Sequence, residues 1–170
     1  RTVLADGMEF KGSRIETHVG GLDDDEVTAG GSPTGYFLRR YIQESTSFTP
    51  EKTVTNKHHW IVYRYAETLL TYAESMANAF RSDMNHTDSD YPYSALWALN
   101  QVRANAGMPA VPLCGYEEFM ERLRNEWRVE FAFEDHRFWD VRRWKIADET
   151  QRELLGVKIV KSESGEKHFY

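Results

Sequence analysis

Three glutamates at four-residue intervals are the residues whose type and spacing could most readily do chemistry. Glu126, Glu130 and Glu134 would stack on one face of a helix, where like charges repel. A di-iron site would offset that repulsion, but it uses Glu-x-x-His motifs, and no glutamate here has a histidine three residues later. Glycoside hydrolysis needs two carboxylates at a set separation in a cleft, which spacing along one helix does not establish.

Arginine offers a structural alternative for these carboxylates. A guanidinium group binds a carboxylate in a planar fork and packs its flat face on aromatic rings. Such pairing would explain why residues 130–144, EFAFEDHRFWDVRRW, interleave charges with rings. We therefore favour a buried ion-pair framework over a catalytic centre, and we expect Trp139 and Trp144 to lie in the core. The predicted framework consists of Arg64, Glu67, Glu74, Arg103, Glu126, Arg128, Glu130, Glu134, Arg137, Asp140, Arg142 and Trp144.

Other catalytic or metal-binding patterns are weak. His58 and His59 are adjacent, so in an extended segment they point to opposite faces. The four consecutive acids at 23–26 lack the alternating oxygen ligands of a calcium loop. The single cysteine, Cys114, allows no internal disulfide and no cysteine metal cluster. Since no nucleophile elbow, phosphate loop or HExxH motif is present either, we expect no catalytic residue, metal or cofactor.

The composition limits the class of partner. With 41% hydrophobic and 28% charged residues, the 170-residue chain has an ordinary globular composition. Its net charge of −6 argues against non-specific nucleic-acid binding, which needs Lys and Arg to replace counterions. No apolar run approaches the ~20 residues that span a bilayer, and no signal peptide is recognisable.

Turn residues and hydrophobic periodicity divide the chain into three segments. Residues 1–60 are interrupted repeatedly by glycine and should form loops with short extended pieces. Residues 61–146 should hold a helical core, and residues 147–170 a hairpin-like tail. We expect the three segments to form one domain that is part of a longer protein.

The helical core should contain several short helices. Apolar spacing predicts a helix over 61–82, with Tyr65 on its buried stripe, and a second over about 91–106. Asp90 would cap the second helix, and Gly107 would adopt the left-handed conformation after its end.

The third helix should begin near Tyr116 and break near Asp135, before a last short helix that ends at Trp144. This order predicts a mainly α fold, a bundle or helical repeat with long irregular loops and a small β-hairpin.

Four stretches resemble motifs of the SusD/RagB family. Their order and spacing agree over roughly two-thirds of the chain. Residues 64–77 resemble the family's RYAE-x-LL-x-YAEA helix, and residues 99–109 its LN-x-VR-x-RAGLP segment. Residues 128–144 are similar to its R-x-ELAFEG-x-R-x-x-DL-x-RW block, and residues 34–41 to its TGY-x-x-RK stretch. Asp135 departs from the pattern, because the family usually has glycine there.

The resemblance implies a tetratricopeptide-like helical fold, of which this chain would be the C-terminal portion. It also implies a surface-exposed lipoprotein of the bacterial outer membrane, with membrane contact only through a lipid anchor outside this chain. Such proteins capture a glycan or glycopeptide ligand and deliver it to a TonB-dependent outer-membrane transporter. They are not enzymes. If the rest of the solenoid is missing, the isolated chain should expose apolar faces and self-associate.

Sugar-binding proteins use exposed aromatic faces with polar neighbours, so a few rings are candidate ligand contacts. These are Tyr36, Trp60, Tyr91 and Tyr93. Each could instead be buried, since aromatic side chains bury large areas. Two other functions stay open from the residues: a helical-repeat module that binds another protein, and a carboxylate-based enzyme.

Overall fold

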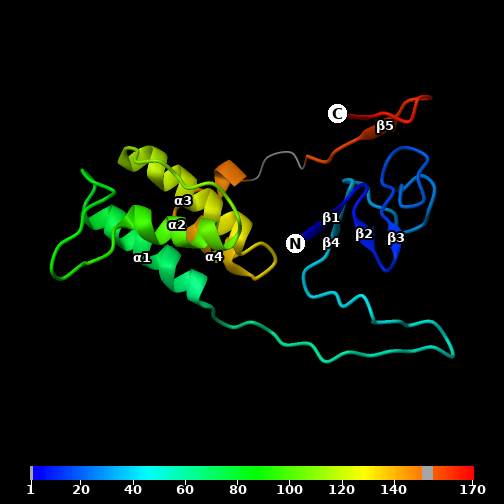
Figure 1. Cartoon of the computed structure of the whole chain (residues 1–170), viewed down its shortest axis with the longest axis horizontal. Coiled ribbons are helices and arrows are strands. Elements are labelled where there is room, and N and C mark those ends of the chain that lie inside the picture. The colour runs from blue at the N-terminus through cyan, green and yellow to red at the C-terminus, as the bar shows by residue number, and fades with distance from the viewer. Residues whose placement is uncertain (1, 151–154) are drawn as a thin grey trace. The chain divides into compact units, whose positions relative to one another are not determined.

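The computed structural model describes residues 2–150 and 155–170, which fall into two compact units (Figure 1). One unit, Trp60–Ala147, is helical. The other combines residues 1–59 with residues 148–170 and contains short strands. The fold is therefore mainly α with small hairpins, as the sequence predicts.

Four helices build the helical unit: α1 (Tyr65–Ala79), α2 (Ala95–Asn105), α3 (Tyr116–Glu130) and α4 (His136–Arg143). Helix α1 packs against α2 and α3, and α3 contacts α4. Each of the three longer helices turns an apolar stripe inward, and one cluster of buried side chains joins the stripes. Its fully buried members include Leu70, Leu99, Phe119 and Leu123.

The first two helices are shorter than predicted. Helix α1 begins at Tyr65 and ends at Ala79, and Tyr65 is exposed rather than part of the buried stripe. The predicted cap Asp90 is wrong, because Ser94 caps α2 by accepting a hydrogen bond from the Trp97 amide at 3.0 Å. Gly107 does follow the helix with φ +72°, as predicted.

The turn between α3 and α4 adopts an unusual backbone conformation. Helix α3 ends at Glu130, and residues 131–135 form turns. Asp135 precedes α4 with φ +62°, in the left-handed region that glycine enters without steric cost. The chain therefore keeps a glycine-like conformation at the position where the SusD/RagB motif usually has glycine.

The strand-containing unit is held together by three two-stranded antiparallel pairings among the described residues. Strand β1 (Val3–Ala5) pairs with β4 (Tyr36–Leu38), and β2 (Glu9–Phe10) pairs with β3 (Ser13–Arg14). The tail forms the predicted hairpin. Its strands β5 (Ile159–Lys161) and β6 (Lys167–Phe169) follow a short 3-10 helix, η1 (Asp148–Thr150).

Two close contacts tie the tail to the segment between β3 and β4. The Val19 amide donates to the Ile159 carbonyl at 2.8 Å. Gly35, with φ +79°, has no room for a Cβ, since one would lie 2.7 Å from the Val157 carbonyl oxygen. Segments from both ends of the chain therefore form one unit.

Asp6 forms the main buried ion pair of this unit. Its carboxylate is paired with the Lys167 ammonium and lies 3.5 Å from His18 Nδ1. Burial alone would raise the pKa of Asp6, but the hydrogen bonds and charges of Lys167 and His18 outweigh burial and lower that pKa. Ionised Asp6 therefore stabilises the folded state.

We expect Asp135→Gly to raise the free energy of unfolding by about 0.5–1 kcal/mol, because it relieves left-handed strain at a non-glycine residue. Asp135→Val should lower it, since a β-branched residue tolerates this region least. Urea unfolding of the three proteins measures the differences. A destabilising Asp135→Gly change would show that the aspartate side chain matters more than the backbone strain.

We expect Lys167→Met to lower the free energy of unfolding near neutral pH. Because the folded-state pKa of Asp6 lies below its unfolded value of about 3.9, the stabilisation is present above that value and is lost as the pH falls through the folded pKa. The deficit of the variant should therefore shrink below about pH 4. Lys161→Met, at the exposed cross-strand partner in the same hairpin, is the control and should change little. A deficit independent of pH would contradict the assignment.

Candidate functional site

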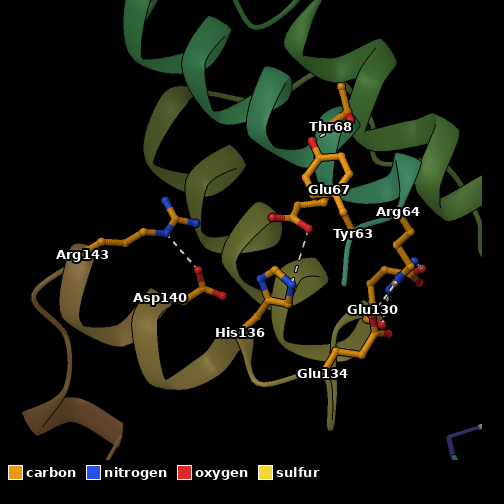
Figure 2. Close-up of polar contacts among 9 residues, drawn as sticks. All are labelled: Tyr63, Arg64, Glu67, Thr68, Glu130, Glu134, His136, Asp140 and Arg143. Atoms are coloured by element: carbon orange, nitrogen blue, oxygen red, sulfur yellow. Dashed lines mark hydrogen bonds and ion pairs between the residues drawn. The ribbon is translucent and has the colours of Figure 1, made fainter. Parts of the chain in front are cut away.

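The α1–α3 side of the helical unit is organised by Arg64, which immediately precedes α1 (Figure 2). Its Nη1 donates to Glu130 Oε1 at 2.5 Å, and its Nε donates to Glu134 Oε2 at 2.9 Å. Its Nη2 donates to the Glu130 carbonyl at 2.8 Å, and the guanidinium lies 4.0 Å from the centre of the Phe131 ring. One side chain thus binds the Glu130 side chain and carbonyl at the end of α3 and the Glu134 side chain in the following turn. The expectation that all three glutamates stack on one helix face is wrong for Glu134, because α3 ends at Glu130.

The third glutamate, Glu126 on α3, has its own arginine. Arg103 on α2 donates from Nη1 to Glu126 Oε2 at 2.6 Å and from Nε to the Pro109 carbonyl at 2.9 Å. Glu126 is only 4% exposed, so its charge is compensated inside the unit. The Arg103 side chain connects α2, the following loop and α3.

Arg143 is a framework residue that the sequence analysis missed. Its Nη1 donates to Glu74 Oε1 at 2.5 Å and its Nε to Asp140 Oδ1 at 2.9 Å. The Trp144 indole also donates to Glu74, at 2.8 Å. Burial acts to lower the pKa of Arg143. Its hydrogen bonds to the two carboxylates act in the opposite direction and outweigh burial, so the pKa is raised. The spacing of Asp140 and Arg143, three residues apart on one helix face, could have indicated this pair.

The remaining predicted arginines do not bind the glutamates. The Arg142 guanidinium stacks 3.4 Å from the centre of the Phe138 ring and donates to the Phe138 carbonyl. Among the residues that the structure describes, Arg128 and Arg137 show no carboxylate within ion-pair distance. Burial and the nearby charge of Arg128 lower the pKa of Arg137.

A hollow of about 670 Å³ lies beside this framework, and we call it the α1–α4 hollow because its lining comes mainly from those helices. Glu67 lines it from α1 and His136 from α4; Glu67 Oε2 and His136 Nε2 are 3.6 Å apart (Figure 2). Trp139 also lines it and is 66% exposed. The expectation that Trp139 lies in the core is therefore wrong, whereas Trp144 is half-buried against the core.

The candidate ligand-binding rings are exposed. Tyr93 stacks on Trp97 at 4.2 Å, and Tyr91 meets Phe80 edge-on at 5.7 Å, so both lie at the loop before α2. Trp60 is exposed in the segment before α1. Tyr36 is exposed on β4, in the strand-containing unit. The structure places Tyr91 and Tyr93 in one loop and Tyr36 in a different unit.

The described residues hold no group of three or more His, Cys, Asp or Glu side chains that could bind a metal ion. None of the helices within residues 2–150 and 155–170 is long and apolar enough to cross a membrane.

Comparison with known proteins gives one family. The model of the SusD family matches residues 2–166. The chain belongs to the SusD family. Its structure also matches the crystal structure of a SusD-like protein from Bacteroides fragilis NCTC 9343, with a TM-score of 0.74 and 28% sequence identity. No curated protein matches the chain.

The SusD-like protein is longer than this chain. The alignment covers 99% of this chain and 31% of that protein, so the chain spans about a third of its length. The resemblance to the SusD/RagB family and the tetratricopeptide-like helical fold are thereby confirmed.

The SusD-type motifs meet one another in the structure. The 64–77 motif contributes Arg64 and Glu74, whose partners Glu130, Glu134 and Arg143 lie in the block at 128–144. Arg103 of the LN-x-VR segment pairs with Glu126, just before that block. Residues separated by 66–70 positions are thus brought within hydrogen-bond distance. The glutamates that could have formed a reactive group of carboxylates are therefore bound by arginines.

We expect Arg64→Leu to lower the free energy of unfolding by about 3–5 kcal/mol, because it leaves Glu130 and the 3%-exposed Glu134 side chain without their shared counter-charge. Arg64→Lys should lower the free energy of unfolding by a smaller amount, since an ammonium keeps the charge but cannot form the planar fork. Urea unfolding is the measurement. Arg122→Leu, which breaks an exposed pair with Glu118, is the control and should cost less than about 1 kcal/mol. Equal costs for Arg64→Leu and Arg122→Leu would disprove the framework role.

Proposed function

We propose that this chain is part of a cell-surface glycan-binding protein of the SusD type, which hands oligosaccharides to a TonB-dependent transporter in the outer membrane. The family match over residues 2–166 carries the proposal. In this role the membrane contact is a lipid anchor outside the chain, and the ligand is a glycan or glycopeptide.

The arrangement of charges favours binding over catalysis. A general acid or nucleophile must reach its substrate, but Glu126, Glu130 and Glu134 each accept hydrogen bonds from an arginine. The exposed rings suit recognition instead, since they can stack on sugar rings while nearby polar groups bind hydroxyls. We propose Tyr91 and Tyr93 as ligand contacts for this reason, with Tyr36 and Trp60 as further candidates.

A second function is supported by the apolar surface of the helical unit. Val129, Phe133, Phe138 and Trp139 are all exposed around the α3–α4 turn and α4. Exposed apolar surface of this kind is typical of protein–protein contacts. A protein-binding helical repeat without carbohydrate affinity is therefore the alternative.

We expect the full-length protein to be retarded in native gels that contain its polysaccharide, when tested against a panel of plant, host and bacterial glycans. No reducing sugar should be released during the experiment, because Glu126, Glu130 and Glu134 are bound by arginines. Tyr91→Ala and Tyr93→Ala should each weaken the retardation, by about tenfold in affinity. Failure of every glycan in the panel would favour the protein-binding alternative, and release of reducing sugar would favour an enzyme.

A further inference from the structure

A groove of about 430 Å³ lies between α1 and α2, which pack side by side (Figure 1). We call it the α1–α2 groove. Leu69 on α1 and Val102 on α2 are buried and contribute apolar side chains to its lining. Four exposed side chains also line it: Tyr65 on α1, and Trp97, Gln101 and Asn105 on α2. Its volume lies in the range of small-molecule sites.

The exposed part of this lining is accessible to a ligand. Tyr65 is 70% exposed and Trp97 is 37% exposed. Trp97, Gln101 and Asn105 follow one another at four-residue steps, so they lie along one face of α2. Neither amide side chain makes a hydrogen bond with the residues that the structure describes, so both can bind a ligand.

The charges of the groove favour a neutral ligand. Arg64 is the one charged residue in its described lining, and the Arg64 guanidinium already binds Glu130 and Glu134. A phosphate or a nucleic acid would need positive charge that is not compensated in this way. A metal ion would need carboxylate, imidazole or thiolate ligands, and no Asp, Glu, His or Cys contributes to the described lining.

A sugar matches both kinds of group in the groove. An amide side chain donates and accepts hydrogen bonds, and so does a hydroxyl group. The rings of Tyr65 and Trp97 offer flat apolar surfaces to the C–H face of a pyranose. An apolar surface with a few convergent polar groups is the usual composition of a small-molecule site.

The groove also adjoins a ring that we propose as a ligand contact. Trp97 stacks on Tyr93 with 4.2 Å between the ring centres. From Trp97 to Asn105, helix α2 extends about 12 Å further, which is longer than one pyranose ring. An oligosaccharide that binds at Tyr93 can thus continue along α2.

We infer that the α1–α2 groove is a subsite for an uncharged oligosaccharide. The Tyr65 and Trp97 rings pack on sugar rings, and the Gln101 and Asn105 amides bind sugar hydroxyls. This inference rests on the proposed glycan-binding function and extends the ligand contacts from the loop before α2 onto the helices.

The test uses the full-length protein and an oligosaccharide of the glycan that retards it most strongly in the affinity gels. Titration calorimetry measures the affinity. Tyr65→Ala should weaken binding by about tenfold, as expected for an aromatic residue in a contact. Gln101→Ala and Asn105→Ala should each weaken binding by about fivefold, because each removes hydrogen bonds to hydroxyls. Trp97 is left in place, because its removal would also release Tyr93.

Asn125→Ala is the matched control. It removes an exposed amide of α3 that does not line the groove, so it should leave affinity unchanged. Because all four replaced side chains are exposed, the variants should unfold near the wild-type temperature, which thermal unfolding checks.

A second measurement reports contact with the ligand directly. Hydroxyl-radical labelling read by mass spectrometry gives the oxidation rate of Tyr65 relative to that of Tyr170, an exposed tyrosine of the strand-containing unit. The ratio corrects for radicals that free sugar consumes. It should fall when the oligosaccharide is added to saturation, because bound sugar covers Tyr65.

The outcomes are distinct. If the wild-type protein binds no glycan in the panel, the proposed function fails and the subsite fails with it. If the wild-type protein binds but the Tyr65, Gln101 and Asn105 variants bind equally well, the subsite is wrong and the proposed function stands. If Tyr65 is already protected from oxidation without ligand, another part of the protein fills the groove, and the subsite is again wrong.

Discussion

Arg64 solves an electrostatic problem on which the helical unit depends. Glu130 at the end of α3 and Glu134 in the following turn carry like charges that repel, and burial makes each uncompensated charge more costly. A single guanidinium binds Glu130 and Glu134 at once, because its planar fork presents several donors in fixed directions. It also lies over the Phe131 ring, so the charge is compensated without opening the core to water. The start of α1 is thereby joined to the turn between α3 and α4.

Local patterns predicted the helices well because burial follows the helical period. The stripes that pack into the core were readable from the spacing of leucine, phenylalanine and tryptophan, and Gly107 marked the end of α2. The α2 start was misplaced because both Asp90 and Ser94 are good caps, and only Ser94 lies within reach of the Trp97 amide. Asp90 instead belongs to a turn in which its amide, like that of Tyr91, donates to Asp88.

The framework contacts were less predictable, since they join residues far apart in the chain. Charge balance suggested arginine partners for the glutamates, but not which arginine. Arg142 and Arg143 are neighbours, and helix phase alone sends Arg143 toward Glu74 and Arg142 along Phe138. The same reasoning explains Trp139: a residue type that favours the core is exposed when α4 turns it away from the shared cluster. The α1–α4 hollow has no signal in the local sequence, because its walls come from three helices.

The carboxylates of the helical unit differ in how completely they are used, and this difference connects the fold to function. Glu126, Glu130 and Glu134 are bound by arginines that also hold backbone carbonyls, so a ligand would have to displace structural contacts to reach them. Glu67 lies in the first turn of α1, and its Oε2 is 3.6 Å from the His136 imidazole, beyond hydrogen-bond distance. A network in which every donor and acceptor is paired makes a rigid framework, but it leaves no donor or acceptor to bind a ligand. Sites of recognition are therefore expected where that network is incomplete, on rigid helices whose geometry the arginine contacts have already set.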